Sequence, residues 1–138
     1  MNLIETYNGI LNENNYLALA TSVEGEANVR VVNYYENPAV PGILYIRTKN
    51  DKQKVVEFTA NPVVAFATII KSKYEYIRVQ NAVIERCMEP LSEEIKLAFT
   101  KREPNFSEKN EGTVFFAIHF QSVSVTINPT SPALTVKF

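Results

Sequence analysis

The sequence predicts a mainly β protein whose six or so antiparallel strands form a barrel or a strongly curled sheet. Most of its extended segments follow one another through short turns, as antiparallel strands do. Closing the sheet removes the exposed edges that such a chain would otherwise present. The extended segments are residues 16–22, 27–35, 43–48, 63–70, 74–85 and 113–127, and three short helical segments accompany them.

The first helical segment, residues 2–12, has apolar residues at three- and four-residue steps and ends before Asn14. The first two extended segments, residues 16–22 and 27–35, flank the turn sequence Glu24-Gly25-Glu26. Apolar segments joined by so short a turn predict an antiparallel hairpin. We therefore expect the helix to lie over a sheet that begins with this hairpin.

The middle of the chain predicts a strand followed directly by a helix. Residues 43–48 form the third strand, and residues 52–60 form a helix that Asn61-Pro62 ends. Asp51 has the residue type and the position of an N-cap for this helix.

The rest of the chain adds three extended segments and a third helix. Residues 63–70 are nearly continuous in apolar residues, which predicts a strand buried on both faces. Residues 74–85 form the next strand. A helix begins after Pro90 with Ser92 as its cap, and residues 113–127 form one long final β segment.

Size and composition limit the classes of function. We interpret the 138 residues, 46% of them hydrophobic, as a single domain, residues 1–138. A net charge of −1 argues against a general nucleic-acid binder. One cysteine forms no intrachain disulfide, the first residues lack a targeting leader, and no apolar stretch reaches the roughly 20 residues that cross a membrane. We expect a cytoplasmic protein without membrane or nucleic-acid partners.

The surplus of apolar residues over what one small barrel can hold predicts a homodimer. Aromatic side chains near strand centres would be buried at the shared face. The residues concerned are Tyr34, Tyr35, Tyr74 and Tyr76.

The strongest candidate for a binding site is the run from Tyr45 to Lys54, where an apolar strand becomes basic at the start of a helix. The free N–H groups of a first helical turn and the positive end of the helix dipole attract anions. Thr48 adds a hydroxyl group, and the cations are Arg47, Lys49, Lys52 and Lys54. Such a run is also typical of a solvated helix face, and a capping carboxylate would compete with an anion for the same N–H groups.

Three other residues have side chains that could take part in binding or catalysis. Arg30 lies in the middle of an apolar strand, where an arginine needs an ion-pair partner or an anionic ligand. His119, the one histidine, is typical of a packed side chain, and Cys87 of an inert thiol. We therefore expect no metal site and name no catalytic side chain.

Four segments together resemble the FMN-binding split-barrel family typified by pyridoxamine 5′-phosphate oxidase. The resemblance covers about residues 16–84. It is carried by Asn28-Val29-Arg30-Val31-Val32-Asn33-Tyr34, Leu44-Tyr45-Ile46-Arg47-Thr48, Lys52-Gln53-Lys54 and Asn61-Pro62-Val63-Val64-Ala65.

The resemblance implies a dimer with two FMN sites at the subunit interface. Arg30 would contact the ribityl phosphate region, and the backbone of the segment from Val31 through Val32 to Asn33 would meet the flavin ring edge. Lys54 would hold the phosphate. The remaining site residues would be Arg47, Thr48, Lys52 and Gln53.

Departures from the family pattern indicate a member other than a vitamin B6 oxidase. Lys52 and Gln53 stand where the oxidases carry serine and arginine, and Tyr76 and Asn81 where they carry glutamine and glycine. The last residues, 131–138, lack the arginine and histidine that grip the B6 substrate. The chain is more similar to the short flavin reductases and nitroimidazole-reductase-like proteins.

The resemblance thus implies an FMN-dependent oxidoreductase that passes electrons from a reduced nicotinamide nucleotide, NADH or NADPH, to an unidentified small acceptor. In such proteins the flavin performs the redox step. The alternatives are a non-catalytic flavin carrier or sensor, a split barrel that binds haem or a deazaflavin, and a structural module without a cofactor.

Overall fold

The computed structural model describes residues 2–109 and 111–138 and contains three helices and eight strands in these parts of the chain. The helices are α1 (Leu3–Glu13), α2 (Gln53–Ala60) and α3 (Glu93–Arg102). The strands are β1 (Tyr16–Val23), β2 (Glu26–Asn33), β3 (Ile43–Lys49), β4 (Val63–Thr68), β5 (Tyr76–Arg86), β6 (Thr113–His119), β7 (Ser122–Thr126) and β8 (Leu134–Lys137).

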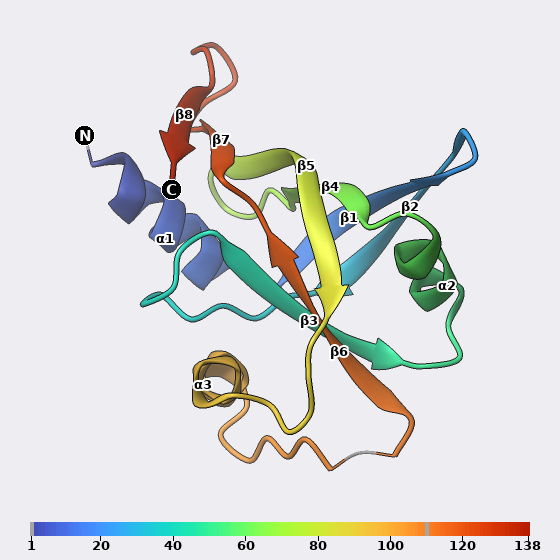
Figure 1. The fold of residues 1–138 in the computed structure, drawn as a ribbon. Coiled ribbons are helices and arrows are strands. Elements are labelled where there is room, and N and C mark those ends of the chain that lie inside the picture. Colours follow the sequence, from blue (N-terminus) through green and yellow to red (C-terminus); the bar gives the residue numbers. More distant parts are fainter. Residues whose placement is uncertain (1, 110) are drawn as a thin grey trace.

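All strand pairs are antiparallel, and the main order is β2-β1-β4-β5-β6-β3, with β7 pairing with β5 and β8. The sheet curls until its two ends approach each other (Figure 1). Just beyond β2, Tyr35 forms an isolated bridge with Tyr45 of β3, with both N···O distances 2.8 Å. The predicted curled antiparallel sheet is confirmed.

The hairpin between β1 and β2 is closed by a two-residue turn. Glu24 and Gly25 have φ values of 52° and 80°, and Val23 pairs with Glu26. Two consecutive positive φ values match the right-handed twist of the strands on either side. The resulting register places Arg30 opposite Leu19.

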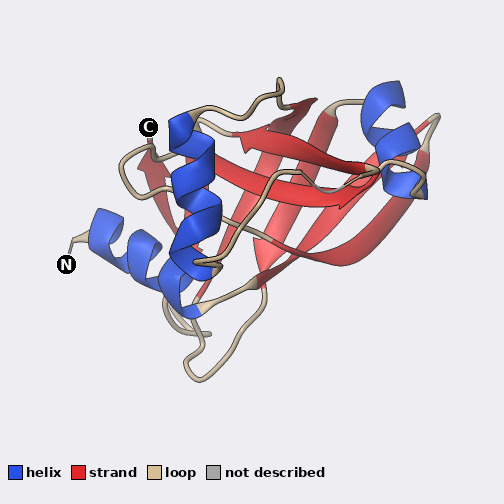
Figure 2. Ribbon diagram, turned by 90° about the horizontal axis from the view of Figure 1, so that it is seen from below, coloured by secondary structure: helices blue, strands red, loops and turns tan. Residues whose placement is uncertain are grey.

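Two hydrophobic clusters, one on each face of the sheet, hold the fold together. Strand β3 contributes side chains to both clusters. Leu44 and Ile46 point into the curl, where the larger cluster lies. Tyr45 points outward to a second cluster, which contains Phe99 of α3. Helices α1 and α3 lie at one end of the sheet, and α2 lies at the opposite end (Figure 2).

The predicted final segment, residues 113–127, is two strands instead of one. The Phe120 N–H donates to the Gly42 carbonyl at 2.9 Å, so β6 ends beside the start of β3. β7 then pairs with β5 and with β8. β8 was not predicted, because a four-residue strand after Pro132 has too short a pattern to read from sequence.

Two further predictions about burial are wrong for the single chain. In β4 only alternate residues are buried, Val63 is exposed, and the strand ends at Thr68 rather than at residue 70. Tyr34 and Tyr35 are buried within the chain's own core, so they are not at a shared face. Their hydroxyl groups bond to atoms of the same chain, which makes them part of the fold.

No helix in the described parts of the chain is long and apolar enough to cross a membrane. The same residues contain no group of three histidine, cysteine, aspartate or glutamate side chains placed to hold a metal ion.

Candidate functional site

The start of α2 has no side-chain cap among the described residues. Its N-cap is Lys52, which makes no capping hydrogen bond, whereas Asn2 caps α1 and Ser92 caps α3. The prediction that Asp51 caps this helix is therefore wrong: Asp51 is exposed in the turn before Lys52, one residue too early. Within the described residues, no carboxylate caps the first N–H groups of α2, of which the Val55 N–H donates to the Lys52 carbonyl at 3.1 Å.

Lys54 lies in the first turn of α2 and is half-buried. Burial lowers the pKa of Lys54, and the nearby positive charges of Arg30 and Lys52 lower it further. Within the described residues, no carboxylate lies within ion-pair distance of Lys54. A partly buried cation without a counter-ion, beside two other cations, favours an anionic ligand.

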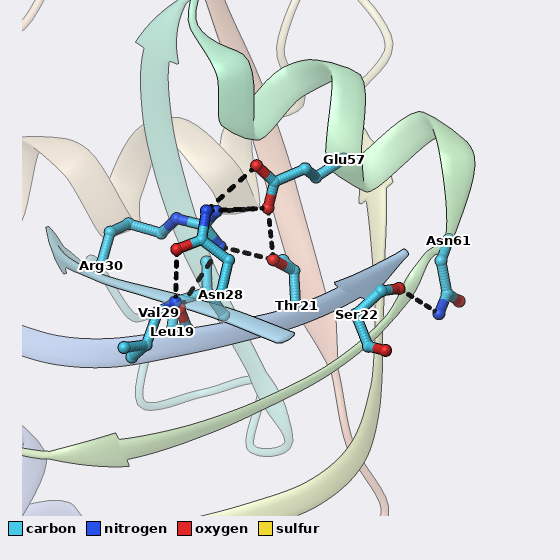
Figure 3. A network of polar contacts seen from close by, with 8 residues as sticks. All are labelled: Leu19, Thr21, Ser22, Asn28, Val29, Arg30, Glu57 and Asn61. Atoms are coloured by element: carbon cyan, nitrogen blue, oxygen red, sulfur yellow. Dashed lines mark hydrogen bonds and ion pairs between the residues drawn. The ribbon is translucent and has the colours of Figure 1, made fainter. Parts of the chain in front are cut away.

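Arg30 is fixed by a network that joins β1, β2 and α2 (Figure 3). Its Nη2 lies 2.5 Å from Oε1 of Glu57, and its Nη1 donates to Oγ1 of Thr21 at 2.9 Å. Thr21 also donates to Glu57 at 2.5 Å, and Asn28 Nδ2 donates to the other oxygen of Glu57 at 3.2 Å. These four side chains form one connected network at the edge of the sheet.

The charge of Glu57 is strongly stabilised in this network. The hydrogen bond from Thr21, with a further one from Arg30, lowers the pKa of Glu57 to about 2 although burial opposes the shift. Glu57 is therefore ionised at any physiological pH and neutralises one cation. Arg30 and Lys52 lie close to Lys54 at this corner of the molecule, formed by β2 and the start of α2, while Asp51 precedes Lys52, and Glu24 and Glu26 line the cavity beside Glu57.

The remaining predicted residues of β2 lie along its free edge, since β2 pairs only with β1 in the described sheet. Val31 and Asn33 are exposed, and Val32 is buried. Gln53 is exposed at the start of α2 and, with Asn28 and Glu57, lines a cavity of about 380 Å³. The structure thus brings Arg30 of β2 close to Lys52 and Lys54 at the start of α2, whereas Val31, Val32 and Asn33 continue along β2 beyond Arg30.

Arg47 and Thr48 do not share a face, because neighbouring residues in a strand point to opposite sides of the sheet. Thr48 is buried on the side of Leu44 and Ile46. Arg47 points to α3, where its Nη2 lies 2.6 Å from Oε2 of Glu103. Its guanidinium also lies over three aromatic rings, at 5.3 Å from Tyr35, 5.7 Å from Phe99 and 5.9 Å from Phe106.

In the described chain Arg47 is therefore held by Glu103, and its expected place in the site with Thr48 and Lys54 stays a prediction. The contacts of Arg47 fasten α3 to β3.

Sequence reasoning missed three members of the corner: Thr21, Asn28 and Glu57. The available signal was Glu57 itself, a charged residue beside the core residue Phe58 on the buried side of α2. A carboxylate in that position needs a partner, as Arg30 does in β2.

A larger cavity, of about 800 Å³, is lined mainly by residues of β5 and β7. Arg78, Asn81 and His119 contribute to its lining. Nε2 of His119 lies 2.8 Å from Oε1 of Glu85. Cys87 is half-buried, and burial raises the pKa of its thiol to about 11, as expected for an inert cysteine.

Fold and site together define a small curled-sheet protein with a positively charged corner at the start of a helix. The chain belongs to the pyridoxamine 5′-phosphate oxidase-like family, whose model matches residues 10–129. The predicted family and its split-barrel fold are thereby confirmed. A comparison with curated proteins finds no match.

Solved structures share this fold at low sequence identity. A NimC/NimA family protein from Clostridium acetobutylicum has a TM-score of 0.72 at 18% identity, over 98% of this chain and 92% of the other. General Stress Protein 26 from Bacillus anthracis has a TM-score of 0.74 at 15% identity, over 100% of both chains. HutZ, the haem storage protein from Vibrio cholerae, has a TM-score of 0.68 at 17% identity, over 89% of this chain and 94% of the other.

Proposed function

We propose that the protein binds FMN and that the phosphate of FMN lies at the start of α2. The observation that supports this most is the half-buried Lys54, which has no counter-ion in the described chain and lies beside an uncapped helix start. Phosphate is the biological anion that best satisfies free N–H donors and a lysine together. The residues present therefore fit a phosphorylated cofactor.

Each part of the corner has a separate task in this proposal. Lys54 and Lys52 supply charge, and the first N–H groups of α2 donate to phosphate oxygens. The free edge of β2 from Val31 to Asn33 offers backbone donors and acceptors to the polar edge of a flavin ring. Gln53 is exposed at the same helix start, within reach of solvent and ligand.

FMN supplies reversible electron transfer when bound. We propose that the protein passes electrons from a reduced nicotinamide nucleotide, NADH or NADPH, to a small acceptor, and that the chain positions the flavin without a catalytic acid or base. A carrier or sensor of flavin is the alternative on the same site. Bound FMN without oxidation of NADH or NADPH in the presence of nitro compounds, quinones and free flavins would favour the carrier.

We also propose that the protein is a homodimer that associates through the outer face of β2, β1, β4 and β5. The exposed side chains of this face include Val29, Val31, Val63 and Val83, with exposed fractions from 44% to 62%. Between them lie half-buried alanines that are paired across the strands: Ala18, Ala20, Ala65 and Ala67. A largely apolar sheet face of this kind, which Arg78 borders opposite Ala67, is typical of an interface.

Analytical ultracentrifugation tests the dimer. The wild type should sediment as a dimer, and Val29→Glu should shift it toward the monomer because a charge enters the apolar face. Leu97→Glu is the matched control, since Leu97 is exposed to a similar extent, 59%, but lies on α3. A monomeric wild type would contradict the proposal.

The visible absorption spectrum of the purified protein, recorded after FMN has been added and the sample desalted, tests cofactor binding. We expect retained flavin bands for the wild type and for the control Lys73→Ala, which removes an exposed lysine distant from Lys54 in the sequence. We expect weakened retention for Lys54→Ala. A colourless wild type whose fluorescence titration with FMN shows no quenching would contradict the proposal.

A haem protein is the second candidate function. The observation that favours it is the cavity of about 800 Å³, because its lining combines His119 with the cation Arg78. Histidine ligates haem iron, and an arginine can pair with a propionate. A Soret band that forms with hemin in the wild type and is lost in His119→Ala would support this function.

A further inference from the structure

We propose that Glu57 sets the selectivity of the site at the start of α2, here called the α2 corner. Because Glu57 pairs with Arg30, this arginine does not bind the phosphate of the ligand. The site therefore favours phosphorylated flavin less than Arg30, Lys52 and Lys54 would without Glu57. This inference rests on the proposed function and names a specificity-determining residue of the same site. It concerns the choice between FMN, which carries a phosphate, and riboflavin, which does not.

The first argument is that the donors of Arg30 are already occupied. One terminal nitrogen, Nη2, contacts Glu57 at 2.5 Å. The other, Nη1, donates to the hydroxyl of Thr21 at 2.9 Å and faces the carbonyl of Leu19 at 3.4 Å. A phosphate that took over this guanidinium would have to break a charge-assisted pair, which is the stronger kind of hydrogen bond.

The second argument is that Glu57 is itself held in place from three sides. The hydroxyl of Thr21, the amide of Asn28 and the guanidinium of Arg30 all donate to its carboxylate. Its side chain is 9% exposed, so water screens it little. The negative charge is therefore fixed in position and does not swing away when a ligand arrives (Figure 3).

The third argument concerns charge. Arg30, whose Nη2 lies 2.5 Å from Glu57 Oε1, is also close enough to Lys54 to lower the pKa of this lysine, so the Arg30–Glu57 pair lies near Lys54. A fixed carboxylate there repels a phosphate dianion but has little effect on the uncharged end of riboflavin. Removing this charge should raise the affinity for FMN and leave the affinity for riboflavin nearly unchanged.

The experiment measures dissociation constants for FMN and riboflavin in the same preparations by flavin fluorescence. In Glu57→Gln, we expect FMN to bind about tenfold more tightly relative to riboflavin, which corresponds to roughly 1.4 kcal/mol. The readout is the ratio of the riboflavin dissociation constant to the FMN dissociation constant. A purely structural role of Glu57 would weaken the binding of both ligands together and leave this ratio unchanged. Glu103→Gln is the matched control, since it also breaks an arginine pair, of 2.6 Å, but on the α3 side.

Asn28→Ala is a second variant: it keeps the charge of Glu57 and removes two hydrogen bonds to it, of 3.2 and 3.4 Å, together with the bond of 2.9 Å that Asn28 Oδ1 accepts from the Val29 N–H. It should raise the ratio less than Glu57→Gln does. If Glu57→Gln does not fold, a raised ratio in Asn28→Ala still supports the inference. An unchanged or lowered ratio in the folded variants overturns it.

A flavin-free measurement separates this inference from the proposed function. Inorganic phosphate should raise the melting temperature of Glu57→Gln more than that of the wild type. If the wild type binds no flavin and phosphate still distinguishes the two proteins, the FMN proposal fails and the role of Glu57 stands. If FMN binds through Lys54 but neither the ratio nor the phosphate effect changes in Glu57→Gln, the role of Glu57 fails and the FMN proposal stands.

Discussion

Two arginines on neighbouring parts of the sheet, Arg30 and Arg47, differ in what surrounds an otherwise similar ion pair. Each lies close to a glutamate oxygen, at 2.5 Å for Glu57 and 2.6 Å for Glu103. Around Arg47 the other neighbours are three aromatic rings, and Lys49 and Lys109 line the same cavity. Around Arg30 the other neighbours include Lys54, which has no counter-ion in the described chain.

The difference teaches that an arginine in an apolar strand does not by itself indicate a ligand site. The Arg47 pair attaches α3 to β3, with the Tyr35 hydroxyl also donating to Glu103. Although burial raises it, these hydrogen bonds hold the pKa of Glu103 below its ordinary value. A partly buried lysine without an ion-pair partner in the described chain, as Lys54 is, is the feature that favours an anion.

The largest expected effect is on stability at the Arg47 side. Phe99 is fully buried and stacks on Tyr35 with ring centroids 4.3 Å apart. Phe99→Ala should lower the free energy of unfolding by about 3–5 kcal/mol, as large cavities in a core do. Urea unfolding measures it, and FMN affinity should persist in the folded fraction. Loss of FMN binding from protein that remains folded would show that the two regions are coupled.

Lys54→Ala should have the next largest effect, and on ligand binding alone. A charge-assisted hydrogen bond contributes about 1.5–3 kcal/mol, so the dissociation constant for FMN should rise about 10- to 100-fold. Stability should change little, because this lysine has no ion-pair partner in the described chain. Fluorescence titration measures the binding, and an unchanged constant would remove the main distinction between the two regions.

Arg47→Ala should give the opposite outcome. Loss of its contacts with aromatic rings and of a partly exposed ion pair should cost about 1–2 kcal/mol of stability. The FMN dissociation constant should stay within about twofold of the wild type. Tighter or much weaker FMN binding in this variant would show that Arg47 takes part in FMN binding.

A further effect is expected only in acid. The pKa of Glu57 is lowered from 4.5 to about 2 in the folded protein, so its contribution to stability is fully present above pH 4.5 and is lost as the pH falls toward 2. Glu57→Gln should therefore show a shallower decline of melting temperature across this window than the wild type. Identical declines would contradict the assigned network.

The sequence was sufficient for features that depend on local signals. The hairpin turn at Glu24 and Gly25, the helix that Asn61-Pro62 ends, and the Ser92 cap all follow from neighbouring residues. The basic start of α2 could be recognised for the same reason. Its cap could not, since Lys52 rather than Asp51 takes the capping position once the turn before α2 is formed.

Features that depend on register could not be predicted. Arg30 and Glu57 are 27 positions apart, and their contact arises only after β2 pairs with β1 and α2 packs against β1. The opposite directions of Arg47 and Thr48 follow from alternation, but which face meets α3 depends on the pairing of β3 with β6. β8 forms only because β7 supplies a partner.

A crystal structure of the protein grown with FMN tests the central claim most directly. We predict that the phosphate group lies within hydrogen-bond distance of Lys54 Nζ and of the first N–H groups of α2, with Arg30 still paired to Glu57. A phosphate bound elsewhere, with Lys54 in contact only with solvent or protein, would contradict the account.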